Sequence, residues 1–527
     1  MKMLLALLLA SVMVTPKPVS TTPVKDNGKA VEFAMPREIL VSADAAFAAL
    51  VPTWNTFTHR NGNTAFPAVY NVEERKYANV VIEENKALEE EEYTLEMGAT
   101  MVNIKASTPR GAWWALQSLT QIFISALDAE GPAAKIEAVK IQDKPKFSYR
   151  GAHLDCCRHF WTVDQVKDFI DILCIHKLNV FHWHLTEDQG WRIEIKKYPL
   201  LTEIGSVRKE TLVGHYHDIP QKYDATPYGG YYTQDDAREI VAYASERQIE
   251  VIPEIEMPGH MVAALTAYPE LGCTGGPYDV WTKWGISDDV LCLGKESSYK
   301  FLEDVLDEIC ELFPSKYIHI GGDEAPVVRR KSCPACQAKM KELGVKDEVK
   351  LQGYLVGRME KYLQSKGREL IGWDEILDGG ISKDAIVMSW RGAKGGIEAA
   401  RLGNRVIMTP STHFYLDYYQ APDPNTVEPL AIGGRVTLEQ CYSFDPYNKL
   451  TKDQQQYIIG IQANLWTEYI PNYAHLQTMA LPRYAALSED GWGSVKDKYS
   501  VFHDRVAATL VKEYKFFGFN YAPYEFE

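Results

Sequence analysis

Eight candidate strands recur between residues 148 and 464, and amphipathic helical patterns separate most of them. The strands cover residues 148–155, 179–185, 250–256, 317–321, 368–373, 385–390, 405–409 and 458–464. Parallel strands need a long crossover, usually a helix, between one strand and the next. Eight such units predict an α/β fold, a (β/α)8 TIM barrel, with an open doubly wound sheet as the alternative.

The intervening segments carry helix signals. Thr162 and Gln165 form a capping-box pattern, and apolar residues follow at helical spacing up to Leu173. Similar apolar stripes begin near Ala237 and Phe301. The connection 376–384 is too short for a full helix, so one strand–helix unit is expected to be irregular.

The chain changes character near residue 145. Residues from about 30 to 142 mix short strands, such as 79–82, with one amphipathic helix over 111–122. This region carries no obvious catalytic residues. We therefore expect a small α+β domain over residues 19–145 and the barrel domain over 146–527.

Residues 1–18 resemble a secretory signal peptide. Lys2 precedes a short apolar run that ends at Ala10, which is too short to span a bilayer. A buried N-terminal strand is the alternative, and no clear cleavage motif follows the run. The sequence thus predicts export to the periplasm or the extracellular space, without an integral membrane span.

Charge and composition narrow the class of partner. The net charge of −15 and the absence of a basic cluster argue against nucleic acid and anionic membranes. The chain has 12 Trp and 30 Tyr, whose rings suit the C–H faces of sugars, although large cores also use aromatic residues. An uncharged or weakly charged substrate fits best.

Two consecutive carboxylates, Asp323 and Glu324, follow the fourth predicted strand. Gly321 and Gly322 precede them and would let a ligand approach the backbone. The pair could instead be solvated loop acids or a helix N-cap. Polar and Trp residues also follow most of the other predicted strands, and the C-terminal strand ends form the active-site face of a barrel. This recurrence favours a catalytic pair.

The nine cysteines leave at least one free thiol, whatever pairs form. Cys273 and Cys292 flank a Gly/Pro/Trp-rich loop, and Cys333-Pro-Ala-Cys336 could be a tight disulfide, a redox pair or half of a zinc site. The chain has no second CxxC motif. We therefore expect structural disulfides and no metal site.

Seven motifs, in the same order, resemble those of the family 20 glycoside hydrolases, the exo-acting β-N-acetylhexosaminidases. They are Arg150-Gly-Ala-His-Leu-Asp-Cys-Cys-Arg-His-Phe160, His182-Trp-His-Leu-Thr-Glu-Asp-Gln-Gly-Trp-Arg192, Pro253-Glu-Ile-Glu-Met-Pro-Gly-His260, His319-Ile-Gly-Gly-Asp-Glu324, Gly372-Trp-Asp-Glu375, Ser389-Trp-Arg-Gly392 and Leu465-Trp-Thr-Glu468. Glu187 and Glu256 stand where the family commonly has Asp, so they are assigned no catalytic role.

The resemblance implies a retaining, substrate-assisted mechanism in which the 2-acetamido oxygen of the sugar attacks the anomeric carbon. Glu324 would be the general acid and then the general base. Asp323 would orient the acetamido N–H, and Tyr415 would donate to the acetamido oxygen. Asp188 and His260 resemble the pair that supports the acid. No cofactor is implied.

The resemblance also implies a pocket for a terminal, non-reducing N-acetylhexosamine of an oligosaccharide or glycoconjugate. Trp373, Trp390 and Trp466 resemble the aromatic walls and floor of that pocket. Arg158, Asp417 and Glu468 would bind hydroxyls at its closed end.

Two other functions remain as alternatives. His182 and His184, with His260 and His319, could hold a metal in an amidohydrolase-type barrel. The chain could also be a non-catalytic glycan-binding protein. The sequence leaves open the aglycone, the preference between N-acetylglucosamine and N-acetylgalactosamine, and the oligomeric state. The segments 205–230 and 270–290 are expected to shape the sites beyond the cleaved bond.

Overall fold

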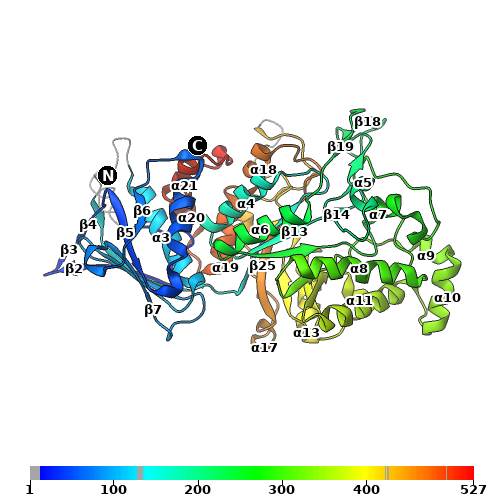
Figure 1. Cartoon of the computed structure of the whole chain (residues 1–527), viewed down its shortest axis with the longest axis horizontal. Helices are drawn as coiled ribbons and strands as arrows, with labels where there is room; N and C mark the ends of the chain where they lie inside the picture. The colour runs from blue at the N-terminus through cyan, green and yellow to red at the C-terminus, as the bar shows by residue number, and fades with distance from the viewer. Residues whose placement is uncertain (1–11, 128–134, 422, 424–426, 494, 527) are drawn as a thin grey trace.

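A computed structural model describes residues 12–127, 135–421, 423, 427–493 and 495–526. The chain forms an N-terminal sheet domain joined to a closed barrel (Figure 1). The apolar run predicted to be a secretory leader lies almost entirely outside the described residues.

The N-terminal domain is built on a seven-stranded mixed sheet in the order β1-β11-β8-β9-β7-β5-β6. Its strands are β1 (Ser20–Pro23), β5 (Glu38–Ala43), β6 (Ala68–Asn71), β7 (Val80–Glu84), β8 (Tyr93–Met97), β9 (Val102–Ala106) and β11 (Val139–Asp143). The predicted α+β domain is thus confirmed.

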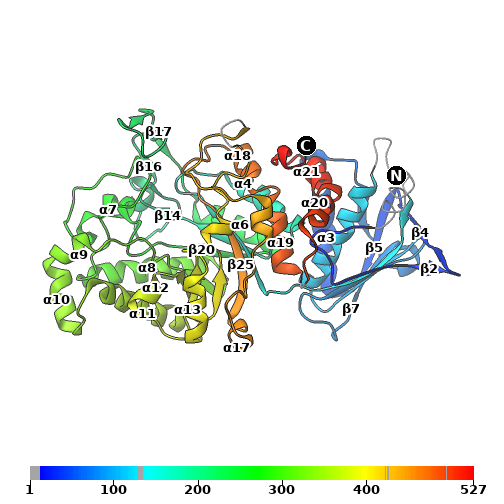
Figure 2. The ribbon, with the colours of Figure 1, turned by 180° about the vertical axis from the view of Figure 1, so that it is seen from behind.

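Helix α3 (Pro109–Ala126) covers this sheet and forms the domain's core. Thr108 caps it by accepting the Gly111 N–H, and Pro109 occupies the first turn, where no N–H is needed. Its rings, including Trp113 and Trp114, are fully buried, and the C-terminal helix α21 (Leu510–Phe517) packs on it (Figure 2). The last helix of the chain therefore joins the two domains.

Buried ion pairs also fasten the domains together. Arg150, at the start of the first barrel strand, pairs with Glu91 through contacts of 2.5 and 3.2 Å. Lys177 lies 3.1 Å from Asp143. Removing one partner of such a pair would leave an uncompensated buried charge. The sheet domain is thus held at the N-terminal ends of the barrel strands, away from the face predicted to be catalytic.

Residues just before the predicted leader boundary at 18 pack into the fold. Val14 and Thr15 are buried. The Thr15 amide donates to the Gln121 side chain at 2.6 Å, and the Lys17 amide donates to Glu489 at 2.9 Å. Cleavage after residue 18 would remove these contacts, so a cleavage site further upstream fits the structure better.

Eight parallel strands close the barrel, and β12 pairs with both β13 and β25. The strands are β12 (Tyr149–Asp155), β13 (Val180–His184), β20 (Glu250–Glu254), β21 (Tyr317–His319), β22 (Glu369–Trp373), β23 (Ile386–Ser389), β24 (Val406–Met408) and β25 (Ile458–Leu465). Each predicted strand overlaps one of them. Closure excludes the open sheet and confirms the (β/α)8 barrel.

The main helices around the barrel are α4 (Val163–Ile175), α6 (Gln234–Glu246), α8 (Glu296–Leu312), α11 (Glu348–Ser365), α13 (Lys394–Leu402) and α19 (Arg483–Trp492). The predicted capping box at Thr162 is formed. Between β22 and β23 the structure has only the short α12 (Ile376–Gly379), as expected.

A second irregular unit, which the sequence analysis did not predict, lies between β24 and β25. Over its described residues it contains short helices, among them α14 (Ser411–Phe414), α16 (Leu438–Tyr442) and α17 (Lys452–Gln455). Tyr415 directly follows α14. This unit therefore brings Tyr415 beside the C-terminal end of β25, while its α17 contacts α13, one of the helices around the barrel.

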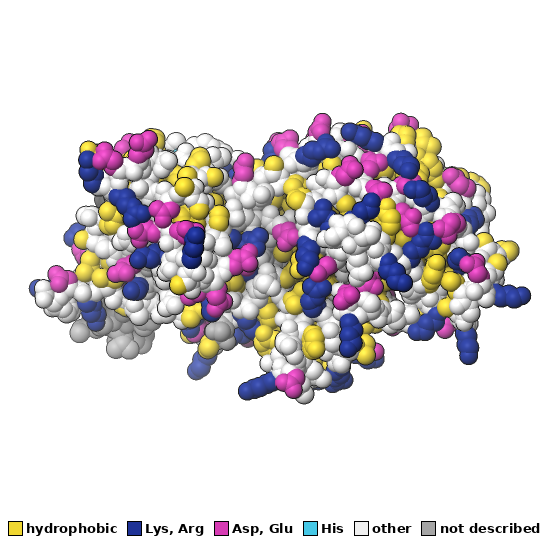
Figure 3. Space-filling view, turned by 60° about the horizontal axis from the view of Figure 1, so that its bottom comes forward, with side chains coloured by type: hydrophobic (Ala, Val, Ile, Leu, Met, Phe, Trp, Pro, Cys, Tyr) yellow, Lys and Arg dark blue, Asp and Glu magenta, His cyan; other side chains and the backbone are white. Residues whose placement is uncertain are grey.

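Within the described residues no helix has the length and apolar character needed to cross a membrane. Figure 3 shows acidic and basic side chains interspersed over one face of the molecule, without a broad patch of one sign.

The predicted disulfides are not formed: all nine cysteines are free. Around Cys292, the sulfurs of Cys333 and Cys336 lie at 3.6 and 3.7 Å, whereas a disulfide requires about 2.05 Å. The sequence reasoning also assumed that four zinc ligands would need a second CxxC motif. That assumption is wrong, because Cys273 and Cys292 reach the CxxC motif from separate parts of a loop.

Candidate active site

A cavity of about 390 Å³ opens at the C-terminal ends of the barrel strands, a volume suited to a small ligand. Its lining consists mainly of carboxylates and aromatic rings. The carboxylates are Glu187, Asp323, Glu324, Asp417 and Glu468, and the rings are Tyr216, His260, Trp284, Trp390, Tyr415, Tyr418 and Trp466. Arg158 supplies the one Lys or Arg side chain among the described lining residues.

Asp323 and Glu324, the acidic pair, lie on a tight turn that follows β21. Gly321 and Gly322 have φ of 65° and 98°, and a Cβ on Gly321 would lie 1.8 Å from a Glu256 oxygen. The turn therefore requires glycine there. Glu324 itself has φ of 43°, and such strained backbone tends to persist where function requires it. Gln352 holds the turn by donating to the Gly322 carbonyl at 2.7 Å.

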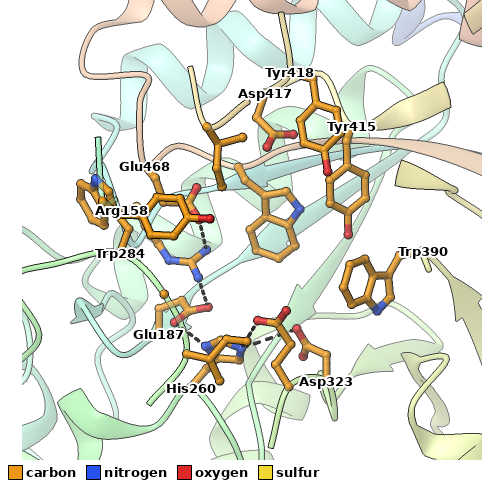
Figure 4. Close-up of a pocket in the computed structure, with 16 residues that line it drawn as sticks. Arg158, Glu187, His260, Trp284, Asp323, Trp390, Tyr415, Asp417, Tyr418 and Glu468 are labelled. Carbon is orange, nitrogen blue, oxygen red and sulfur yellow. Dashed lines mark ion pairs between the residues drawn. The ribbon is translucent and has the colours of Figure 1, made fainter. Parts of the chain in front are cut away.

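His260 links the acidic pair to two further carboxylates, and Figure 4 shows its contacts with Glu187 and Asp323. Its Nε2 lies 3.5 Å from Glu324 Oε2 and 3.6 Å from Asp323 Oδ2. On the other side of the ring, Nδ1 lies 3.0 Å from Glu187 Oε2 and 3.4 Å from Asp188 Oδ2. Glu187 is thus the nearer carboxylate to Nδ1.

These carboxylates decide the charge of His260. Burial lowers the pKa of His260, but the opposing charge of Glu187, with the nearby carboxylates of Asp188 and Glu324, raises it well above the usual value. The imidazole is therefore protonated at neutral pH, and it places a positive charge beside the acidic pair.

Burial also raises the pKa of Asp323 to about 6, with Glu324 adding to the rise and His260 opposing it. Below that pH Asp323 is protonated and neutral, so it cannot stabilise positive charge. We predict that kcat/KM falls on the acid side with an apparent pKa near 6. A pH–rate profile tests this, and an acid limb at the ordinary aspartate value of about 4 would contradict it.

One end of the cavity is organised by Arg158, which follows β12. Its guanidinium lies 2.6 Å from Glu187 and 3.8 Å from Glu468, and it sits 5.2 Å above the Trp466 ring. Asp417 lies nearby, and burial followed by the charge of Glu468 raises its pKa well above the usual value. One buried Asp417 oxygen has no protein partner. Ligand hydroxyls can supply the missing hydrogen bonds.

The other end is an aromatic wall. Trp390, after β23, stacks on Tyr415 with centroids 5.9 Å apart and an interplanar angle of 20°. The Trp390 indole N–H donates to the Glu375 carboxylate at 2.9 Å. The backbone of Tyr415 forms an isolated parallel β-bridge with Asn464 in β25. Figure 4 shows the Tyr415 hydroxyl and the Trp390 ring on the side of the cavity opposite Arg158. The wall is therefore held rigidly.

Nine of the eleven predicted site residues line this cavity: Arg158, His260, Asp323, Glu324, Trp390, Tyr415, Asp417, Trp466 and Glu468. Asp188 and Trp373 lie behind it. Asp188 accepts the Val262 N–H at 3.0 Å behind His260. Trp373 is 1% exposed, donates to Glu254 at 2.8 Å, and lies 5.9 Å from Trp466. The roles of all eleven residues in substrate binding and catalysis stay predictions.

Glu187 is the main residue that the sequence reasoning set aside. It was given no role because the family commonly has Asp there, yet it contacts both Arg158 and His260. Its pKa is raised by burial but lowered further by these two cations, so it is ionised. Its position at a strand end, beside Asp188, was the available signal. Tyr216 and Trp284 come from the two loops expected to shape the site.

The histidines of the metal-dependent alternative lie deeper, inside the barrel. His182, His184 and His319 converge on Glu254 at 3.0, 2.5 and 2.9 Å, and all four side chains are fully buried. His260 contacts Glu187 and Asp188 instead. The predicted set of His182, His184, His260 and His319 does not form one cluster among the described contacts.

Comparison with known proteins identifies the family to which the chain belongs. Residues 147–495 match the model of the glycosyl hydrolase family 20 catalytic domain, and residues 12–144 match that of its domain 2. The chain is 48% identical to a beta-hexosaminidase of Porphyromonas gingivalis over 78% of its own length and 52% of that protein. It therefore spans about half the length of that relative. It is 38% identical to a beta-hexosaminidase of Vibrio furnissii, over 79% of this chain and 67% of that one.

Solved structures agree with these matches. An exo beta-N-acetylglucosaminidase of Vibrio harveyi, solved with N-acetylglucosamine, has a TM-score of 0.84 and 31% identity over 97% of this chain and 79% of that one. A beta-N-acetylhexosaminidase of Bacteroides fragilis has a TM-score of 0.80 and 28% identity, and 97% of each chain is covered. The barrel and the preceding sheet domain are thus those of one known group of glycoside hydrolases, and the chain belongs to glycosyl hydrolase family 20.

Proposed function

We propose that the protein is an exo-acting β-N-acetylhexosaminidase that removes terminal, non-reducing N-acetylhexosamine with retention of configuration. The family membership supports a glycosidase. The acidic pair beside protonated His260 carries the proposal most directly, because it supplies a proton donor and a neighbouring anion at one edge of a small cavity.

The sugar itself supplies the nucleophile in this proposal. Asp323 and Glu324 are consecutive, and both approach the same nitrogen of His260. A retaining enzyme with a protein nucleophile needs a second carboxyl about 5–5.5 Å away on the opposite face of the sugar. Glu187 and Glu468 lie at the Arg158 end, within 4 Å of the guanidinium. This arrangement supports attack by the acetamido oxygen of the substrate.

The reaction then has two steps. Glu324 protonates the leaving oxygen while the acetamido oxygen attacks the anomeric carbon, the glycosidic bond breaks and an oxazolinium ring forms. Asp323 accepts the acetamido N–H and stabilises the positive charge, and Tyr415 holds the acetamido oxygen in line. In the second step Glu324 takes a proton from water, and the water oxygen attacks the anomeric carbon. The bond between that carbon and the acetamido oxygen breaks, which opens the ring and restores the acetamido group.

The closed end of the cavity sets the mode of cleavage. Arg158, Asp417 and Glu468 gather there, and their guanidinium and carboxyl groups can form hydrogen bonds with sugar hydroxyls. Only a sugar without a further residue on that side would fill the site. The substrate is thus proposed to be an oligosaccharide or glycoconjugate that ends in β-linked N-acetylhexosamine.

Nitrophenyl glycosides test this function. The N-acetyl-β-glucosaminide and N-acetyl-β-galactosaminide should be hydrolysed, and the β-glucoside, which lacks the acetamido group, should be hydrolysed far more slowly. Equal rates on glucoside and N-acetylglucosaminide would overturn the proposal.

We also propose that the protein is exported and that its leader ends before Val14. The basic, apolar start of the chain supports export, and the buried contacts of Val14 and Thr15 support an upstream cleavage site. N-terminal peptide mapping of protein recovered outside the cytoplasm should find a mature start upstream of Val14. A start after residue 18, or an uncleaved cytoplasmic protein, would contradict this prediction.

A further inference from the structure

Four cysteine sulfurs meet beside the active-site loops, although the cysteines are spread over 64 residues of sequence. The Sγ–Sγ distances are 3.6 Å for Cys292–Cys333, 3.7 Å for Cys292–Cys336 and 3.8 Å for Cys273–Cys336. All four sulfurs lie within 4.8 Å of one another. Cys292, Cys333 and Cys336 are buried, and Cys273 is partly buried.

These distances match a tetrahedron of thiolates around one metal ion. Zinc binds cysteine sulfur at about 2.3 Å, and tetrahedral geometry then separates the sulfurs by about 3.8 Å. Cys292 and Cys336 each lie almost equally far from two other sulfurs. Such even spacing is expected around a shared central atom, whereas a disulfide would bring one sulfur much closer than the others.

The backbone presents the ligands from two connections. Cys333 precedes helix α10 (Pro334–Leu343), and Cys336 lies in its first turn. Cys273 and Cys292 come from the long segment after β20, where the Cys292 amide donates to Leu271 at 2.9 Å. Gly294 lets this segment pass closely, because a Cβ there would lie 2.1 Å from the Ala335 backbone.

A buried cation accompanies the cluster. Arg330 is 1% exposed, and its carbonyl accepts the Cys333 N–H at 3.3 Å. Four thiolates around Zn²⁺ carry a net charge of −2, and a nearby guanidinium reduces the cost of burying it. All four ligands come from the protein, so no open position is left for a substrate or water, as in structural zinc sites.

We propose that Cys273, Cys292, Cys333 and Cys336 form a structural zinc site. It joins the connection after β20, which carries His260, to the connection after β21, which carries Glu324. Leu291, beside Cys292, donates to the Pro258 carbonyl at 2.9 Å, and Arg330 donates to the Ala325 carbonyl at 2.6 Å. The site lies on the side of the barrel domain far from the N-terminal domain, where Figure 1 places α9 (Val328–Ser332) and α10.

Metal analysis of the full-length chain tests the proposal without relying on its enzymatic activity. Protein purified without added chelator should contain about one zinc per chain. Cys336→Ser should lose most of it. Cys310→Ser, which removes a partly buried cysteine outside the cluster, should keep it. After chelation, wild type refilled with cobalt should show the strong visible absorption of tetrahedral cobalt thiolate.

A second measurement covers the case in which Cys336→Ser does not fold. A mercurial added to wild type should release zinc in step with modification of these cysteines, as followed by a metal-binding dye and peptide mapping. Disulfides among the four cysteines in non-reducing peptide maps would overturn the proposal. So would iron in place of zinc, a chain without metal, or zinc retained in folded Cys336→Ser.

Discussion

Glu324→Gln is expected to lower kcat/KM on an aryl N-acetyl-β-glucosaminide by about 10³-fold, within the usual range for loss of a general acid–base group. The amide cannot donate its proton to the leaving oxygen or take one from water. Glu324 borders the cavity and lies 3.5 Å from His260 Nε2. Because glutamine has nearly the same shape as glutamate, the exchange should leave binding of the product sugar largely intact. Steady-state kinetics and product binding measure the two effects.

Substrates whose leaving groups differ in their need for protonation make this test more specific for the acid role. A dinitrophenyl leaving group needs little protonation, so Glu324→Gln should lose less rate in the first step with that substrate than with a methylumbelliferyl one. Glu398→Gln makes the same chemical change at an exposed position and should behave as wild type. Wild-type rates in Glu324→Gln, or an equal loss with both leaving groups, would contradict its assignment as the acid.

Asp323→Asn is expected to lower kcat by about 10²–10³-fold, comparable with the loss of one preorganised electrostatic contact to a transition state. Asp323 is buried, and one of its oxygens has no protein partner, so it is free to accept the acetamido N–H. An amide in its place can neither balance the positive charge of the oxazolinium ring nor fix the direction of the acetamido group.

The pH profile separates this role from a structural one. If ionisation of Asp323 causes the fall of kcat/KM below about pH 6, Asp323→Asn should show no such fall, in addition to its lower kcat. Asp453→Asn, at an exposed position in α17, should change neither quantity. An unchanged acid limb in Asp323→Asn would assign the limb to another group.

The fold followed closely from the sequence because its strands are short apolar runs bounded by turns. Residues 179–185 and 250–256, for example, became β13 and β20 with nearly the same limits. Strands buried on both faces are mostly apolar, even where they carry inward polar groups such as His182, His184 and Glu254, so their pattern largely survives without tertiary information. The irregular unit between β24 and β25 was missed because α14, α16 and α17, which lie in its described part, are only four or five residues long.

The active-site residues were predicted less completely than the strands, because the contacts of a side chain depend on the tertiary fold. Glu187 was set aside by residue type, but its carboxylate meets Arg158 and His260. Trp373 sits at a strand end, as expected, yet its ring turns toward Glu254 inside the barrel. The cysteine cluster could not be predicted from the sequence, because Cys273 and Cys292 lie far along the chain from the CxxC motif. The fold of two loops brings them close to it.

The central claim, that the substrate's acetamido oxygen is the nucleophile, is tested most directly by fluorinating the N-acyl group. Each fluorine withdraws electron density from that oxygen without changing the protein. We predict that kcat/KM falls steadily from the N-acetyl to the mono-, di- and trifluoroacetyl glycosides. Rates independent of fluorine content, together with a sugar attached covalently to the protein, would contradict the account.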